Sequence, residues 1–188
     1  MRFRRTLRHR AAVASAIALA ATAVGTTASA HDAPEVASTS DATLALSAMA
    51  CPLAGESDFS DSWGDARSGG RRHQGVDMIA ERGTPVVATL AGFAEFKNTR
   101  AGGKSVWLTT ADGDKFFYAH LDQWLGESRD VERGEVIGSV GSTGNAGGPH
   151  LHFEVRPGSE AINPYPPTAR ACAPEPAPPR QPIQWLLR

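Results

Sequence analysis

The run from Gly148 to Val155 (GPHLHFEV) constrains this chain most strongly, because polar and apolar residues alternate along it. Such alternation predicts a β-strand, in which side chains point to opposite faces with a period of two. His150, His152 and Glu154 would share one face, and the apolar residues between them would share the other. A strand of this kind needs a core beneath its apolar face. Two neighbouring imidazoles on the open face are typical of a metal or hydrolytic site.

The region between Cys51 and Cys172 continues this β pattern. Apolar and β-branched runs separated by glycine-containing turns predict strands at 84–90, 93–97, 105–110, 115–121, 135–140 and 150–155. Asp112-Gly113 is a strong hairpin signal between two of these runs. No eleven-residue window has a convincing helical period, apart from a single turn near residues 121–125. The sequence therefore predicts an all-β fold: an antiparallel sheet with its apolar face inward and the histidines on the other face.

Residues 1–30 have the composition of a secretory signal peptide. Five arginines in the first ten residues precede an uncharged, alanine-rich run of 14 residues, and Ala28-Ser29-Ala30 supplies a small-residue cleavage site. The apolar run is short for a membrane span. Arg4-Arg5 has a weak twin-arginine character, but the general export route is favoured. We therefore expect a secreted protein that begins at His31 after cleavage.

The 158 mature residues fit one domain with two tails. Residues 31–50 predict a flexible lead-in, 51–172 the folded domain, and 173–188 a proline-rich tail. No repeat, wall-binding module or transmembrane helix follows the signal, so we expect a monomer without a stable membrane anchor. The mature part carries 14 basic and 20 acidic residues, a net charge of −6. Nothing in it resembles the basic surface of a nucleic-acid-binding protein.

The two cysteines, Cys51 and Cys172, lie at the two ends of the predicted domain. In an oxidising compartment they are expected to form a disulfide bond. In the chain-entropy model a bridge closing so long a loop contributes about 4–5 kcal/mol. Two unrelated thiols, or a lipid-bearing Cys51, are the alternatives. The residues before Cys51 lack the usual leucine, which disfavours the lipid.

Two further histidine segments accompany the His150 strand: His73-Gln74-Gly75-Val76-Asp77, and Tyr118-Ala119-His120-Leu121. One aspartate and two histidines make a plausible three-ligand shell for zinc, leaving the fourth position for water, as in catalytic sites. On a flat strand His73 and Asp77 would lie about 13 Å apart, too far for one ion. If both bind one metal, the backbone must bend at Gly75. Spacing alone does not decide which of His150 and His152 is the ligand.

The three motifs, in this order, resemble those of the lysostaphin-type (LytM-like) zinc endopeptidases, which cleave peptidoglycan. The resemblance covers roughly residues 59–166, with Ala146-Gly147 where Ser-Thr is common in the family. It implies one catalytic domain of the duplicated hybrid motif type, with a groove beside the glycine-rich loop 141–148. It further implies one Zn²⁺ per chain, and attack of zinc-bound water on a peptide bond in the stem peptides or cross-bridges of the cell wall.

Carried over residue by residue, the resemblance makes His73, Asp77 and His152 the metal ligands. It places the non-ligand histidines, His150 and His120, beside the water and the scissile carbonyl. His150 is then the candidate general base, and His120 would stabilise the charge that develops on the tetrahedral intermediate.

Other polar residues near these motifs have two readings each. Tyr118 is either a donor to the oxyanion or an ordinary sheet tyrosine. Glu154 either binds the metal or, as we expect, orients a neighbouring residue. Arg71 and Arg72, with Arg67, either bind carboxylates of the substrate or form a solvated basic loop.

Two other functional classes were weighed against the hydrolase. A non-catalytic wall protein that activates or scaffolds other hydrolases is disfavoured, because all five metal and catalytic positions are filled. A structural zinc site would normally need a fourth protein ligand, usually cysteine.

Overall fold

The computed structural model describes residues 46–174. The predicted signal peptide, most of the lead-in and the tail from residue 175 lie outside this range. The described part has eight strands, a 3₁₀ turn and a short helix: η1 (Ser68–Gly70), β1 (Val76–Ile79), β2 (Pro85–Val87), β3 (Gly92–Thr99), β4 (Gly103–Thr109), β5 (Lys115–Trp124), β6 (Arg129–Val131), β7 (Val136–Val140), β8 (His150–Arg156) and α2 (Tyr165–Ala171).

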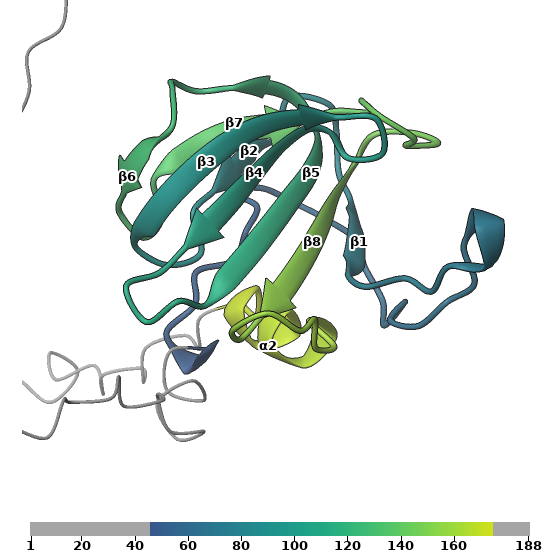
Figure 1. Cartoon of the computed structure of the whole chain (residues 1–188), viewed down its shortest axis with the longest axis horizontal. Coiled ribbons are helices and arrows are strands. Elements are labelled where there is room, and N and C mark those ends of the chain that lie inside the picture. The colour runs from purple at the N-terminus through teal and green to yellow at the C-terminus, as the bar shows by residue number, and fades with distance from the viewer. Residues whose placement is uncertain (1–45, 175–188) are drawn as a thin grey trace, which may run out of the picture. The chain divides into compact units, whose positions relative to one another are not determined.

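The strands form one antiparallel sheet in the order β1-β8-β5-β4-β3-β6, with β7 pairing both β5 and β2 (Figure 1). This confirms the predicted all-β, antiparallel fold. The two short strands β1 and β6 were not predicted, because three or four residues are too few to show a period. β1 pairs with β8, which places Asp77 directly opposite His152.

The apolar face of the sheet covers the core, as predicted. Leu151, Phe153 and Val155 of β8 are buried, together with residues of the neighbouring strands such as Val106 and Phe116. The alternation in β8 therefore places the histidines on the opposite face, where the site lies.

One local prediction was wrong, and one short element was not predicted. Residues 121–125 do not form a helical turn, because Leu121–Trp124 continues β5. Helix α2 was not predicted, since it lies in a proline-rich segment. Its prolines occupy the first helical positions, where the missing N–H groups have no helical partner anyway.

The folded part begins earlier than predicted. Met49 is buried and Leu46 packs against the core, so the last residues of the predicted lead-in belong to the domain. Cys51 and Cys172 form the predicted disulfide bond, which ties this N-terminal segment to the end of α2. No helix among the described residues is long and apolar enough to cross a membrane.

A β-bulge in β5 turns the side chain of His120 to the open face of the sheet. The register between β4 and β5 shifts between Lys104 and Val106, and His120 has a left-handed backbone with φ of 66°. Non-glycine residues rarely adopt this conformation, which is common near active sites. The extra residue places His120 on the open face, although Tyr118, two residues earlier, faces the core.

Candidate metal centre

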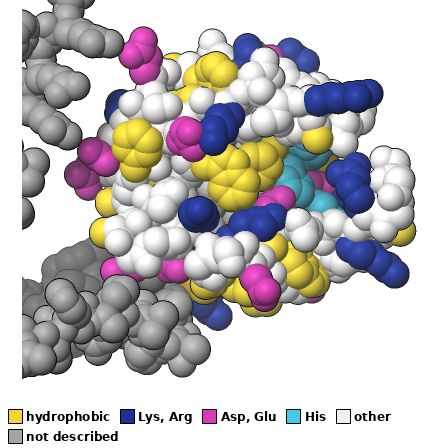
Figure 2. Space-filling view, viewed as in Figure 1, with side chains coloured by type: hydrophobic (Ala, Val, Ile, Leu, Met, Phe, Trp, Pro, Cys, Tyr) yellow, Lys and Arg dark blue, Asp and Glu magenta, His cyan; other side chains and the backbone are white. Residues whose placement is uncertain are grey.

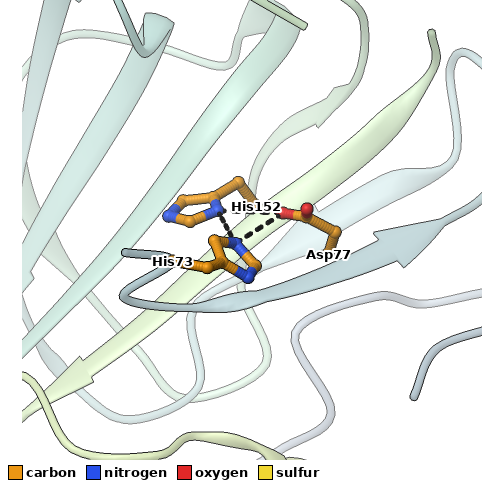
Figure 3. Close-up of side chains that lie close together, drawn as sticks. All are labelled: His73, Asp77 and His152. Atoms are coloured by element: carbon orange, nitrogen blue, oxygen red, sulfur yellow. Dashed lines mark hydrogen bonds and ion pairs between the residues drawn. The ribbon is translucent and has the colours of Figure 1, made fainter. Parts of the chain in front are cut away.

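Three side chains converge on one point above β1 and β8 (Figure 3). His73 Nε2 lies 3.0 Å from Asp77 Oδ1 and 2.9 Å from His152 Nδ1, and His152 Nδ1 lies 2.9 Å from Asp77 Oδ1. A tetrahedral zinc ion with ligands at 2.0–2.1 Å would hold such atoms about 3.3 Å apart. The three atoms are therefore spaced closely enough to share one ion.

The backbone bends at Gly75, as the sequence predicted, and brings His73 next to Asp77. Glycine is needed at this position because His152 and Phe153 lie very close to it, and not because its backbone angles are unusual. A Cβ atom on Gly75 would lie 2.6 Å from both Cε1 of His152 and the carbonyl oxygen of Phe153. Only glycine lets this segment pass so close to His152.

In His73 and His152, the ring nitrogen that points away from the centre (the outer nitrogen) donates a hydrogen bond. His73 Nδ1 donates to the carbonyl oxygen of Ser62 at 2.8 Å, and His152 Nε2 donates to Glu154 Oε1 at 3.0 Å. These bonds orient the rings and leave the inner nitrogens with lone pairs that face Asp77. Three electron-pair donors without a proton between them are the arrangement that a cation requires.

Glu154 contacts His152, and Arg67 contacts Asp77, each on the side that faces away from the centre. Glu154 is buried, contacts His152 Nε2 through Oε1, and accepts a bond from Arg156 Nε at 2.7 Å. Arg67 Nη2 donates to Asp77 Oδ2 at 2.7 Å, leaving Oδ1 to face the histidines. The sequence placed Arg67 in a basic loop, and no local signal indicated that it contacts Asp77.

The charges of the centre favour a cation. Burial by itself would raise the pKa of Asp77, but its short contacts with the rings of His152 and His73 outweigh burial, and this pKa lies far below its ordinary value. Burial would likewise lower the pKa of His152, but the neighbouring carboxylates of Asp77 and Glu154 outweigh burial and raise it. The position between the two histidines and the carboxylate is thus strongly favourable for a positive charge.

His150 and His120 lie beside the centre and outside the ligand set. His150 Nδ1 donates to the carbonyl oxygen of Gly148 at 2.9 Å, and its Nε2 lies 3.8 Å from Asp77 Oδ1. His120 Nδ1 donates to the carbonyl oxygen of Thr143 at 2.8 Å. The two rings are in contact, with centroids 4.7 Å apart. Each therefore keeps an Nε2 lone pair that can accept a proton.

Burial lowers the pKa of His120 to about 4, although its bond to Thr143 partly opposes this effect. His120 is therefore neutral at pH 7, and its Nε2 is an acceptor rather than a donor. This adds a condition to the predicted role of His120: it can stabilise a negative oxygen only after it has gained a proton.

The centre lies in a cleft of about 600 Å³ that crosses the open face of the sheet. In Figure 2 the histidines are visible between an apolar surface on one side and several Lys or Arg side chains on the other. Asn145, Ala146 and Gly147 of the glycine-rich loop line one wall, as the groove prediction required. Arg71 and Arg72 also line the cleft, as does Phe117, which the sequence analysis did not identify.

Phe117 stacks on Trp107 with ring centroids 4.4 Å apart, and it makes a T-shaped contact with the ring of His152. The position of Phe117 in the cleft could have been predicted from the alternation along β5. Phe117 and Ala119 point to the face opposite Phe116 and Tyr118.

Tyr118 does not reach the cleft, so the oxyanion reading is wrong. Its side chain is fully buried in the core, and its hydroxyl group bonds to the backbone N–H and the hydroxyl group of Thr89 at 2.9 and 2.8 Å. The bulge at His120 explains the difference, because strand alternation does not continue across an inserted residue.

Comparison with known proteins agrees with this geometry. Residues 71–164 match the family described as Peptidase family M23. The chain belongs to peptidase family M23. Among curated M23 relatives, the DD-carboxypeptidase/endopeptidase Mpg of Neisseria meningitidis is 44% identical over 95 residues, covering 50% of this chain and 22% of Mpg. The L-Ala–D-Glu endopeptidase of Bacillus subtilis is 40% identical over 123 residues, covering 57% and 38% of the two chains.

Solved M23 structures have the same fold. The catalytic domain of lysostaphin from Staphylococcus simulans has a TM-score of 0.53 and 33% identity, over 58% of this chain and 90% of that domain. A putative glycyl-glycine endopeptidase of Ruminococcus gnavus has a TM-score of 0.57 and 28% identity, over 66% and 60% of the two chains. The chain thus spans a lysostaphin-type peptidase domain, but well under half the length of the curated relatives above.

Proposed function

We propose that this M23 peptidase is an exported zinc endopeptidase that hydrolyses peptide bonds in bacterial peptidoglycan at the cell wall. The observation that carries the proposal is the convergence of His73 Nε2, Asp77 Oδ1 and His152 Nδ1 within 3.0 Å of one another, with both outer histidine nitrogens already donating. One Zn²⁺ per monomeric chain fits this donor set.

Zinc held by His73, Asp77 and His152 would lower the pKa of a water molecule to about 7 and would polarise the carbonyl group of the substrate. The remaining chemistry belongs to the protein. His150 is the general base, because its Nε2 faces the centre while its Nδ1–H is held by Gly148. A base so positioned contributes about 10²–10⁴-fold to the rate.

His120 acts after the proton has moved. It contacts the His150 ring and begins neutral, so it can receive a proton through Nε2 while Thr143 holds its Nδ1–H. The imidazolium formed in this way can stabilise negative charge on the carbonyl oxygen, or protonate the departing amine. The left-handed backbone of His120 positions the ring for this role.

The name of one relative supports peptidoglycan as the substrate, since the peptidoglycan DD-endopeptidase ShyC of Vibrio cholerae is 34% identical over 86 residues. Export is supported by the sequence of residues 1–30. The non-catalytic alternative is disfavoured, because the described structure contains both the three ligands and the two flanking histidines.

Digestion of purified cell walls by the mature protein, residues 31–188, tests the proposal. We expect peptide fragments with new amino termini, identified by mass spectrometry. A chelator should abolish their release, and added Zn²⁺ should restore it. Release of fragments with new reducing sugar ends instead, or undiminished hydrolysis in the chelator, would contradict the proposal.

A further inference from the structure

A second groove, separate from the metal cleft, lies beside the disulfide bond. Its volume is about 850 Å³, and it shares no lining residue with the metal cleft. Cys51 and Cys172 line it, together with residues 55–59, residues 79–81 and Pro149. The groove is therefore a surface feature of its own, and we call it the disulfide groove.

The disulfide groove contains exposed apolar surface. Ile79 is 56% exposed, the highest value among the large apolar residues of the described part of the chain. A single exposed apolar side chain needs no partner, but Ile79 shares the groove with Phe59, Ala80 and Pro149. An apolar surface gathered in a groove is typical of a site that receives another apolar group.

The disulfide groove is also acidic. Glu56, Asp58 and Glu81 line it and are exposed, whereas no Lys or Arg among residues 46–174 lines it. None of these three carboxylates forms an ion pair with a residue that the structure describes. The groove is therefore complementary to an apolar ligand that carries basic residues.

The end of this chain has that composition. Residues 183–188 (IQWLLR) contain four apolar residues and one arginine, and Arg180 precedes them. They are joined to Cys172, which itself lines the groove, by the proline-rich residues 173–182. Ten such residues span about 31 Å when extended, at about 3.1 Å per residue. This spacer is long enough for residues 183–188 to return to the groove.

We propose that residues 183–188 dock in the disulfide groove of the same chain, with their apolar side chains against Ile79 and Phe59. Because exposed ion pairs contribute little free energy, the apolar contact supplies most of the affinity. The short tether to Cys172 adds to it by keeping the segment at a high local concentration.

Charge selects the disulfide groove over the metal cleft. The metal cleft is lined by Arg67, Arg71 and Arg72, which would repel Arg180 and Arg188. The carboxylates of the disulfide groove attract the same two residues instead. The docked segment therefore leaves the metal cleft open, and docking is independent of the proposed endopeptidase function.

Docking would cover the disulfide bond. Cys51 and Cys172 are only partly buried in the described structure, and both line the groove. Reduction of a disulfide bond requires that a thiolate reaches one of its sulfur atoms. The docked segment blocks this approach, so it protects the bond that ties the N-terminal segment to α2.

Photo-crosslinking of the mature protein, residues 31–188, tests where the segment lies. The photoreactive amino acid p-benzoylphenylalanine replaces Trp185, and mass spectrometry maps the crosslinks in a mixture of isotope-light and isotope-heavy chains. We expect crosslinks within one chain to residues 55–59 and 79–81. Crosslinks to residues of the metal cleft, crosslinks between chains, or no crosslink to the domain would overturn the proposal.

Ile79→Ser in the same protein should reduce the yield of this crosslink by about tenfold, the effect of burying most of one large apolar side chain. Phe93→Ser is the matched control, because Phe93 is 47% exposed on β3 and does not line the groove. It should leave the yield unchanged. Circular dichroism verifies that both variants are folded. Equal yields in the two folded variants would overturn the proposal.

The rate of disulfide reduction tests the protection. Trp185→Ser/Leu186→Ser removes two apolar side chains of the segment and leaves the sequence of residues 46–174 unaltered. Dithiothreitol gives two electrons and two protons to the Cys51–Cys172 bond and closes to its own cyclic disulfide. We expect this reduction to be about tenfold faster in the variant than in the wild type under native conditions. An unchanged rate would overturn the proposal, as would faster wall hydrolysis by the variant, which would place the segment in the metal cleft.

Discussion

His73 Nε2 and His152 Nδ1 lie 2.9 Å apart, although 79 positions separate the two residues in the chain. The bend at Gly75 and the pairing of β1 with β8 produce this contact. Each ring donates its outer N–H to a fixed acceptor, so the inner lone pairs face each other and the carboxylate of Asp77. The following predictions depend on that arrangement.

Replacing Gly75 with alanine should disrupt the metal centre. The new Cβ would collide with the His152 ring and the backbone of Phe153, and relief of such overpacking costs about 1–3 kcal/mol. We expect a lower unfolding midpoint in urea and at least tenfold weaker zinc binding. Gly148→Ala is the control, since a Cβ there meets nothing within 4 Å. Equal effects of the two substitutions would show that close packing at Gly75 is unimportant.

Arg67→Met removes the donor that holds Asp77 Oδ2. Loss of a residue that orients a metal ligand typically weakens binding by about 10–100-fold, and we expect that decrease in zinc affinity. Competition with a chromophoric chelator measures it. Arg82→Met is a matched control, because Arg82 makes an ion pair of the same 2.7 Å length with Asp122, outside the site. Unchanged affinity in Arg67→Met would remove Arg67 from the account.

Tyr118 should remain protonated at alkaline pH. Burial raises its pKa, and the bonds to Thr89 oppose this only in part. An unfolded tyrosine loses its proton near pH 10. The folded state holds the proton more tightly, so this group leaves stability unchanged below about pH 10 and lowers it as the pH rises further.

Tyr165→Phe leaves Tyr118 as the only tyrosine, so the absorbance of tyrosinate reports on it alone. We expect this absorbance to appear only together with loss of the near-ultraviolet circular dichroism signal. Ionisation in the folded protein near pH 10 would place Tyr118 in contact with solvent.

Removal of the disulfide bond should destabilise the domain. The bond joins residues 121 positions apart and ties the segment containing Met49 to α2. In Cys51→Ser/Cys172→Ser we expect the free energy of unfolding to decrease by about 3–5 kcal/mol. Urea denaturation at a fixed zinc concentration measures it. Two free thiols per chain in denatured, unreduced wild-type protein would show that the bond does not form.

Much of the site could be predicted from local sequence patterns. Alternation placed His150, His152 and Glu154 on one face, and the glycine between His73 and Asp77 indicated the bend. What could not be predicted depends on contacts between distant segments. The bulge at His120 arises from the register between β4 and β5, and it reverses the expected direction of Tyr118.

Other differences have the same cause. Arg67 reaches Asp77 because the arm folds back on itself, which no periodicity in the sequence reveals. Helix α2 forms in a stretch where the sequence shows no helical period, and Tyr165 packs against Phe59 with ring centroids 6.0 Å apart. The disulfide bond connects its last turn to the N-terminal segment.

The most direct test of the metal assignment is the zinc content of His152→Ala and His150→Ala, measured by elemental mass spectrometry beside the rate of wall hydrolysis. The geometry predicts that His152→Ala loses zinc and activity together. It predicts that His150→Ala keeps about one zinc per chain, as does His120→Ala, while hydrolysis falls by about 10²–10⁴-fold. Loss of zinc from His150→Ala with retention in His152→Ala would contradict the ligand set described here.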